Sequence, residues 1–137
     1  MDMLEISFDP SRIDFPRTSG LILSSYWGGQ RTEDENRRCF AHSFCGAAFL
    51  GGEQVAFGRA ITDRTVFAYL ADVIVWPEQR GKGIGKALVQ AFLDHPELAS
   101  VSHWSLTTSD AQTLYEKFGF VRDGRYMRMV KDRPNLA

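Results

Sequence analysis

The feature that most restricts the fold of this 137-residue chain is a glycine-rich turn between a predicted strand and a predicted helix. The β-prone run Phe67–Val75 ends at Trp76-Pro77, because proline cannot donate to a sheet ladder. Glycines follow at alternate positions, Gly81, Gly83 and Gly85. Apolar residues then recur at helical spacing: Ile84, Ala87, Leu88, Ala91 and Phe92. A strand that passes through a short turn into a helix indicates an α/β domain.

The N-terminal half predicts one short strand, two helices and a β-meander. Residues 4–8 alternate as a strand, and residues 19–26 predict a first helix. Thr32 followed by Glu35 has the form of a capping box, which predicts a second helix ending near Ala41. The runs Ser43–Leu50 and Gln54–Thr62, joined to each other and to the third run by short polar turns, predict an antiparallel meander.

The C-terminal third predicts a strand, a helix and a final strand pair. His103–Thr108 reads as a short strand, and Ser109 to Gln112 has the form of a second capping box that opens a helix. Gly119 follows at the expected C-terminal position of that helix. Phe120–Val130 predicts two strands turning at Asp123-Gly124, which completes one mixed sheet.

Length and composition favour a single domain over residues 1–137, with one core. The net charge of −1 gives no uniform positive field, so we expect no nucleic-acid or membrane partner. Cys39 and Cys45 are too few for a disulfide scaffold, and neither they nor the three histidines, His42, His95 and His103, have metal-ligand spacing. No leader pattern opens the chain, so a cytoplasmic protein without metal is expected.

The glycine turn predicts a site for a phosphate or pyrophosphate. Glycines allow the backbone to approach a ligand closely, and a helix start offers unpaired N–H groups at the positive end of its dipole. Arg80, Lys82 and Lys86 add positive charge. A P-loop would need a first glycine where Arg80 stands, and a dinucleotide fingerprint fails because Lys86 or Leu88 replaces its last glycine.

The spacing that does fit belongs to a known family. The segment R-G-K-G-I-G at 80–85 resembles the Q/R-x-x-G-x-G/A signature of the GNAT acetyltransferases, and L-Y-E-K-F-G-F at 114–120 resembles the family's later helix. The chain is similar to short bacterial-type single-domain members. The resemblance implies a GNAT acyl-CoA N-acyltransferase fold, with a mixed central sheet that is splayed between its fourth and fifth strands and flanked by helices.

The resemblance also implies acetyl-CoA as co-substrate. The pyrophosphate is expected on the loop and helix start, which comprise Arg80, Gly81, Lys82, Gly83, Ile84, Gly85 and Lys86. The pantetheine arm is expected to pair with Val73, Ile74 and Val75, where the fifth strand, Trp104–Thr108, diverges. Thr108 stands where many members have an asparagine that binds pantetheine, so one contact is expected to be weakened or replaced.

The implied reaction is direct transfer in a ternary complex. Tyr115 matches the family tyrosine that protonates the departing thiolate. Several members have a glutamate where this chain has Ala71, which leaves Asp72 as a direct base, a base acting through water, or a structural acceptor. Asp63, Glu53 and Tyr26 could instead serve through water. Cys39 and Cys45 are expected to be core residues, because no nucleophile is required.

The acceptor is expected to be a small amine with an apolar or anionic group. Tyr26, Trp27, Arg59 and Tyr69 are the candidate substrate-binding residues. A protein amine is a further possible acceptor, and a homodimer is possible. The alternative function is a non-catalytic acyl-CoA-binding sensor or subunit, which Ala71 favours and Tyr115 disfavours. Phosphate binding unrelated to CoA is disfavoured by the spacings above.

Overall fold

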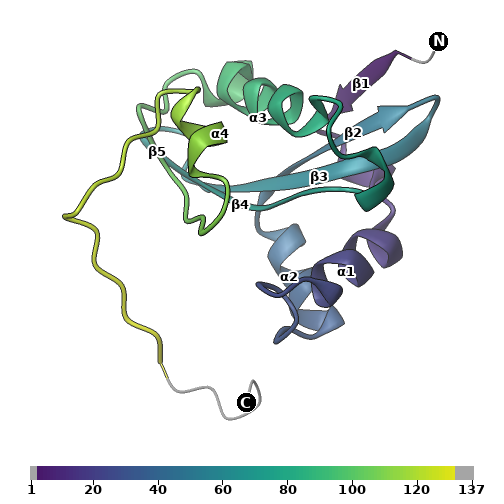
Figure 1. The fold of residues 1–137 in the computed structure, drawn as a ribbon, viewed down its shortest axis with the longest axis horizontal. Coiled ribbons are helices and arrows are strands. Elements are labelled where there is room, and N and C mark those ends of the chain that lie inside the picture. Colours follow the sequence, from purple (N-terminus) through teal and green to yellow (C-terminus); the bar gives the residue numbers. More distant parts are fainter. Residues whose placement is uncertain (1–2, 132–137) are drawn as a thin grey trace.

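The computed structural model describes residues 3–131 as a five-stranded sheet with helices on both faces (Figure 1). The strands are β1 Leu4–Ser7, β2 Phe44–Leu50, β3 Glu53–Thr62, β4 Phe67–Val75 and β5 His103–Ser105. The helices are α1 Phe15–Ser24, α2 Glu33–Ala41, α3 Ile84–Asp94 and α4 Gln112–Glu116. The predicted meander is therefore confirmed as β2, β3 and β4.

The sheet is mixed, in the order β1-β2-β3-β4-β5. The pairs β1–β2, β2–β3 and β3–β4 are antiparallel, and β5 runs parallel to β4. The β4–β5 ladder joins Phe67–Tyr69 to His103–Ser105, while β4 itself continues to Val75. The second half of β4 therefore extends past its parallel partner, and the predicted fold class, with its splayed sheet, is confirmed.

The two faces of the sheet bury different apolar side chains. Helix α3 covers one face with the buried residues Ile84, Leu88, Val89 and Phe92, and α1 and α2 cover the other, where Ile22 is fully buried (Figure 1). Helix α3 follows the predicted apolar stripe and ends before His95-Pro96, as expected. In the described part of the chain, no helix combines the length and apolar character that crossing a membrane requires.

The predicted capping box at the start of α2 is confirmed. The Thr32 hydroxyl accepts from the Glu35 amide at 3.1 Å, and the Glu35 carboxylate accepts from the Thr32 amide at 3.0 Å. We expect Thr32→Ala to lower the free energy of unfolding by about 1 kcal/mol, because the Glu35 amide at the helix start loses its partner. Urea unfolding measures the change, and Thr113→Ala, an exposed threonine on α4, is the control. Equal stability of the two variants would contradict the prediction.

Two helix starts differ from the sequence prediction. Helix α1 begins at Phe15 rather than near Ser19, because the Asp14 carboxylate accepts from the Arg17 amide and a proline stands in the first turn. Ser109 does not cap α4, which begins at Gln112. The Thr108 hydroxyl accepts from the Ala111 amide at 3.0 Å instead.

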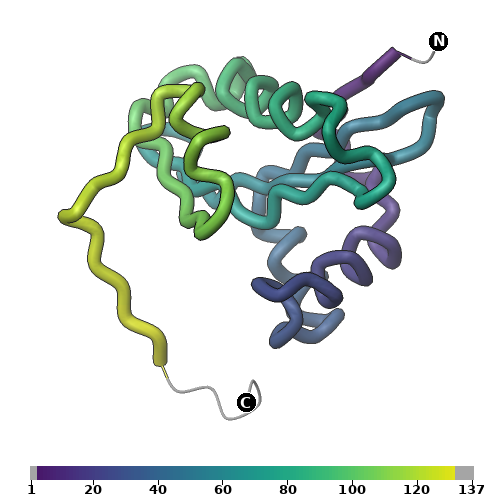
Figure 2. The backbone as a smooth tube through the Cα atoms, viewed as in Figure 1, coloured from purple at the N-terminus to yellow at the C-terminus, as the bar shows by residue number. Residues whose placement is uncertain are grey.

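The predicted strand pair over Phe120–Val130 is wrong. Its turn does form, since the Tyr126 amide donates to the Asp123 carbonyl and the Arg125 amide donates to the Asp123 carboxylate. The flanking residues nevertheless belong to no strand, and the segment runs out from the body (Figure 2). The stability of an isolated two-stranded hairpin is marginal in water, and β5 does not extend the pair by a third strand. Strand β5 ends at Ser105 rather than at the predicted Thr108.

Candidate functional site

The glycine turn leads from β4 into an open helix start. After a short 3-10 turn at Pro77–Gln79, Gly81 and Gly83 adopt φ values of +81° and +79°, which favour glycine. Gly83 occupies the N-cap position of α3 without a side-chain cap. The Ala87 amide makes the first helical bond, to the Gly83 carbonyl at 3.1 Å. The earlier amides of α3 have no carbonyl within the helix, and they form an anion-binding end.

The basic side chains of the turn surround this helix start. A Cβ on Gly85 would lie 3.3 Å from Cγ2 of Val75, so α3 begins directly beside the end of β4. Arg80 donates from Nε to the Val75 carbonyl at 3.4 Å, and Lys82 donates to the Gln79 side chain at 2.9 Å. Lys82 and Lys86 are exposed. The arrangement suits a diphosphate held by backbone amides and two ammonium groups.

A β-bulge interrupts β4 at Asp72. The β3–β4 register shifts between Phe57 and Arg59, and Asp72 has a φ of +53°, which is rare for a residue other than glycine. Gly58 lies opposite the bulge, where a Cβ would approach the Phe92 ring to 3.2 Å. The Asp72 side chain meets residues of the α2 side of the sheet, while Val73 packs against the α3 side.

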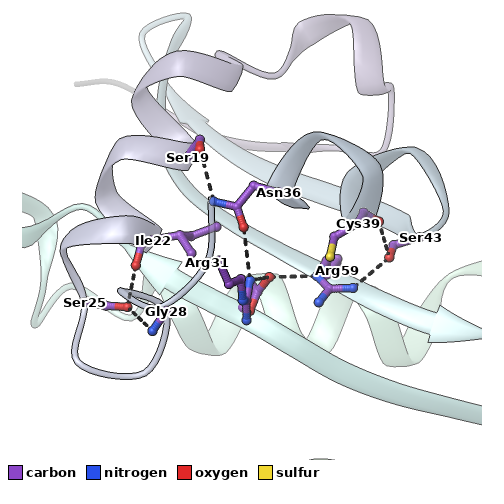
Figure 3. A network of polar contacts seen from close by, with 10 residues as sticks. Ser19, Ile22, Ser25, Gly28, Arg31, Asn36, Cys39, Ser43 and Arg59 are labelled. Atoms are coloured by element: carbon purple, nitrogen blue, oxygen red, sulfur yellow. Dashed lines mark hydrogen bonds and ion pairs between the residues drawn. The ribbon is translucent and has the colours of Figure 1, made fainter. Parts of the chain in front are cut away.

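Two arginines hold the Asp72 carboxylate from different elements, and Figure 3 shows both arginines. Arg31, before α2, donates to both carboxylate oxygens at 2.7 Å, and Arg59 on β3 donates from Nε at 2.7 Å. Arg31 also donates to the Asn36 side chain at 3.3 Å, and Arg59 donates to the Ser43 hydroxyl at 2.9 Å. One carboxylate thus faces two guanidinium groups, and the charge of Glu35 also acts on Arg31.

The Asp72 carboxyl is ionised despite its burial. Asp72 is only 7% exposed, and desolvation acts to raise its pKa. The hydrogen bonds and charges of Arg31 and Arg59 outweigh desolvation, so the pKa lies below the ordinary value. The pKa of Arg31 is raised, chiefly by its hydrogen bonds to Asp72. A carboxylate held in this way is a weak proton acceptor.

Tyr115 lies on α4 beside the core on the α3 side of the sheet. Its ring contacts that of Phe120 edge-on, at 5.9 Å between centroids. Burial, with a smaller effect from the Asp110 charge, raises the pKa of the phenol. Tyr115 therefore keeps its proton at neutral pH, as a proton donor must. It also lines a groove of about 1000 Å³ between β5, α4 and the chain after α4.

The four candidate acceptor residues fall into two groups. Arg59 joins Asp72 directly, and the Trp27 ring lies 5.9 Å from the Arg31 guanidinium carbon, beside the same cluster. Tyr26 and Tyr69 instead contact the chain between β5 and α4. The Tyr26 hydroxyl lies 2.8 Å from that of Ser109, and the Tyr69 hydroxyl donates to that of Thr107 at 2.7 Å.

The hydroxyl of Thr108 is engaged within its own turn. It accepts from the Ala111 amide, as described above, which stabilises the start of α4. Asp63 accepts from three backbone amides of its own turn, so its carboxylate has a structural role there. Ser43 and Asn36 were not predicted as site residues. No local spacing connects them to Asp72, because each is supplied by a different segment.

Neither cysteine forms a disulfide, and the two thiols differ in burial. Burial raises the pKa of the Cys45 thiol to about 12, and its sulfur donates to the Phe40 carbonyl at 3.4 Å. A thiol with that pKa supplies almost no thiolate at neutral pH. Cys39 is a half-buried free thiol. Among residues 3–131, no three histidine, cysteine or acidic side chains gather as a metal site.

The comparisons with known proteins agree on one family. Residues 38–122 match the family model described as "Acetyltransferase (GNAT) domain". A crystal structure described as an acetyltransferase of the GNAT family, from Xanthomonas campestris pv. campestris, is 37% identical; the match covers 99% of this chain and 97% of that one, with a TM-score of 0.89. A predicted acetyltransferase from Clostridium acetobutylicum, solved with acetyl-CoA, is 14% identical, covers 95% and 96% of the chains, and shares the fold at a TM-score of 0.70.

A curated relative matches over a shorter stretch. An N-acetyltransferase of Pyropia yezoensis is 31% identical over 70 residues, which are 50% of this chain and 40% of the relative. The match thus spans less than half the length of that relative.

Proposed function

Because the chain belongs to the GNAT acetyltransferase family, we propose that it transfers an acetyl group from acetyl-CoA to the primary amine of a small molecule. The observation that carries the proposal is the start of α3. This helix start has no side-chain cap and follows two glycines with left-handed φ values. It lies directly beside the end of β4 that has no β5 partner. This geometry suits a ligand that has both a diphosphate and an extended amide-bearing arm. CoA has both.

The proposed binding mode uses backbone groups more than side chains. The amides of the Gly81–Lys86 segment bind the pyrophosphate, and Arg80, Lys82 and Lys86 contribute positive charge near it. The pantetheine arm takes the place of a strand beside Val73–Val75, where β4 has passed the end of β5. Because the Thr108 hydroxyl is engaged by α4, we do not assign it a strong contact with the pantetheine.

The proposed chemistry is a direct transfer. The nitrogen of the neutral amine attacks the thioester carbonyl carbon, and the carbon–sulfur bond breaks. The acetyl group is then bonded to the nitrogen as an amide, and the CoA thiolate departs. Tyr115 donates its phenolic proton to the departing thiolate, and solvent returns a proton to Tyr115. The proton lost from the amine nitrogen passes to solvent.

Asp72 is proposed to position residues rather than to accept the amine proton. Both of its oxygens already accept from guanidinium groups at 2.7 Å, and its pKa is lowered. The sequence left three roles open for Asp72, and the structural acceptor suits these contacts best. Asp72 then fixes Arg31 and Arg59 at the bulge of β4, which is the point where the sheet opens.

The two guanidinium groups of this cluster suggest the class of acceptor. The Asp72 carboxylate contacts both of them, and the Arg31 side chain remains 24% exposed. A cation at a partly dry surface attracts an anionic group, and a guanidinium pairs well with a carboxylate or phosphate. We propose a small amine that carries such a group, with Trp27 beside it.

A thiol-release assay tests the proposal. The purified protein is incubated with acetyl-CoA and pairs of amines that differ only in a carboxylate or phosphate, together with polyamines, aminoglycosides and a lysine peptide. Release that depends on the amine supports transfer, and a higher kcat/KM for the anionic member of a pair supports the acceptor class. Tight CoA binding without release from any amine would instead favour the sensor function, which the engagement of Asp72 by arginines would then explain.

A matched glycine pair tests the CoA site. Gly83 and Gly52 both have left-handed φ values, +79° and +83°, and a Cβ would meet nothing within 4 Å at either position. Valine at either should therefore cause similar backbone strain, about 1–2 kcal/mol. We expect Gly83→Val to weaken CoA binding by at least about tenfold in calorimetry, ~1.4 kcal/mol, because it displaces the amides. Gly52→Val should bind CoA normally, and equal affinities for the two variants would contradict the proposed loop.

A further inference from the structure

Tyr26 is an exposed residue whose hydroxyl is bonded to a distant part of the chain. It is 74% exposed, and its hydroxyl lies 2.8 Å from the Ser109 hydroxyl and 3.5 Å from Oδ2 of Asp110. Tyr26 follows α1, whereas Ser109 and Asp110 lie between β5 and α4. An exposed hydrogen bond of this kind adds little to folding, because water offers the same groups similar partners. Its placement is better explained by the two regions that it joins.

The loop that carries Tyr26 also carries Arg31, to which the proposed function assigns the acceptor. This loop is tightly built (Figure 3), since the Ser25 hydroxyl donates to the Ile22 carbonyl at 2.7 Å and accepts from the Gly28 amide at 3.0 Å. A Cβ on Gly28 would lie 2.5 Å from the Ile22 carbonyl oxygen, so a larger residue would displace the loop. The Arg31 amide donates to the Gly28 carbonyl at 3.2 Å. Tyr26 and Arg31 are therefore held by one short, packed loop.

The segment on the other side of the contact sets the position of α4. The Thr108 hydroxyl accepts from the Ala111 amide at 3.0 Å, and the Tyr115 amide donates to the Ala111 carbonyl at 3.2 Å. The proposed proton donor thus lies one helical turn beyond this start. Burial raises the pKa of the Tyr115 phenol, and the Asp110 charge adds to that shift. A movement of Ser109 would therefore move the start of α4 and, with it, the phenol.

These contacts form a closed ring beside the place where β4 and β5 separate. Its members, in order around the ring, are Tyr26, Ser109, Thr107, Tyr69, Asp72 and Arg31. The loop after α1 closes the ring between Arg31 and Tyr26. Tyr69 is the last residue of β4 in the ladder to β5, and the pantetheine arm is proposed to lie beyond that ladder. The ring therefore borders the space in which the thioester and the amine would meet.

We propose that Tyr26 is a positioning residue, which acts through Ser109 and the start of α4 to hold the Tyr115 phenol at the thioester. The inference rests on the proposed function, because it requires an amine beside Arg31 and a proton donated by Tyr115. The bound amine fixes the loop after α1, and the bond from Tyr26 to Ser109 passes that constraint to α4. Without the bond the amine still meets Arg31, but the phenol is placed less precisely, which slows proton donation.

Steady-state thiol release tests the link in Tyr26→Phe, which keeps the ring and removes the hydroxyl. We expect kcat to fall about tenfold, while the KM for acetyl-CoA stays within about twofold. In a Tyr115→Phe background the same substitution should lower kcat no further, because the group that Tyr26 positions is already absent. Ser109→Ala should reproduce the loss, and Ser109→Thr, which keeps a hydroxyl, should retain the native kcat.

The control is Ser100→Ala, which removes an exposed serine hydroxyl that lies before β5 rather than after it. That hydroxyl donates to the Thr65 carbonyl at 2.9 Å, so one hydrogen bond is lost there as well. The control should keep the native kcat. Losses of kcat that multiply in Tyr26→Phe/Tyr115→Phe would overturn the proposal, because Tyr26 would then act independently of Tyr115.

Hydrogen exchange followed by NMR tests the same link without turnover. The Ala111 and Tyr115 amides are bonded at the start of α4, and both should exchange about threefold faster in Tyr26→Phe. The Ala87 amide at the start of α3 should exchange at its native rate. Unchanged exchange at α4 would overturn the proposal. Faster exchange in a protein that releases no thiol with any amine would keep the link and overturn the proposed function instead.

Discussion

Asp72→Ala is expected to lower the free energy of unfolding by about 3–5 kcal/mol, the largest effect of any single substitution that we propose. The substitution leaves Arg31 and Arg59 facing each other without the carboxylate that both contact at 2.7 Å. Removing one partner of a buried ion pair costs more than the pair itself contributes, because a desolvated charge remains. Urea unfolding followed by circular dichroism measures the loss, which is a large part of the stability of a typical domain.

The control is another ion-paired aspartate, Asp123, whose carboxylate contacts Arg125 at 2.9 Å on the surface. Asp123→Ala should leave stability unchanged, because water replaces the lost contact at an exposed site. Restoring stability in Asp72→Ala by also changing Arg59 to Leu would confirm that the unpaired charge is the cause. Equal stability of the Asp72→Ala and Asp123→Ala variants would contradict the prediction that Asp72 neutralises a buried cluster of charges.

The pH dependence of stability should report the same cluster. The pKa of Asp72 is lower in the folded protein than the value of about 3.9 in an unfolded chain. The unfolded state therefore binds the proton more readily, and the stability contributed by Asp72 is complete above about pH 4. It is lost as the pH falls through the lowered folded pKa. The acid limb of the stability profile should be shallower in Asp72→Asn, and an unchanged limb would contradict the assignment.

The elements that the sequence predicted correctly are those specified by local patterns. The strand β4, the glycine turn and α3 follow from alternation, positive-φ glycines and an apolar stripe within one stretch of chain. The capping box of α2 needs only Thr32 and Glu35. Such patterns act over a few residues, so the sequence alone contains the information that fixes them.

The features that the sequence did not predict depend on contacts between distant segments. The bulge at Asp72 is stabilised by Arg31 and Arg59, which lie 41 and 13 residues away along the chain. Ser109 was expected to cap α4, but its hydroxyl contacts Tyr26 instead. The strand pair after Phe120 was predicted from its alternation and its Asp123-Gly124 turn. Alternation shows that a segment can form a strand, but it does not supply the neighbouring strand.

Replacing Tyr115 with phenylalanine is expected to lower kcat about 100-fold, ~2.7 kcal/mol of transition-state stabilisation. The substitution removes the proton donor but keeps the ring that packs edge-on against Phe120. Stability and the dissociation constant for CoA should therefore change little. Steady-state thiol release with saturating acetyl-CoA gives kcat, and calorimetry gives the CoA affinity of the same preparation.

The pH profile distinguishes an acid from a packing residue. Burial raises the pKa of Tyr115, so the native enzyme should lose activity only at alkaline pH, as the phenol ionises and can no longer donate. That alkaline decline should be absent from the residual activity of Tyr115→Phe. If kcat is unchanged, or if kcat, CoA affinity and stability fall together, Tyr115 serves the packing of α4 and solvent protonates the thiolate. A fall in kcat alone, with the alkaline limb removed, leaves proton donation as the role that accounts for both.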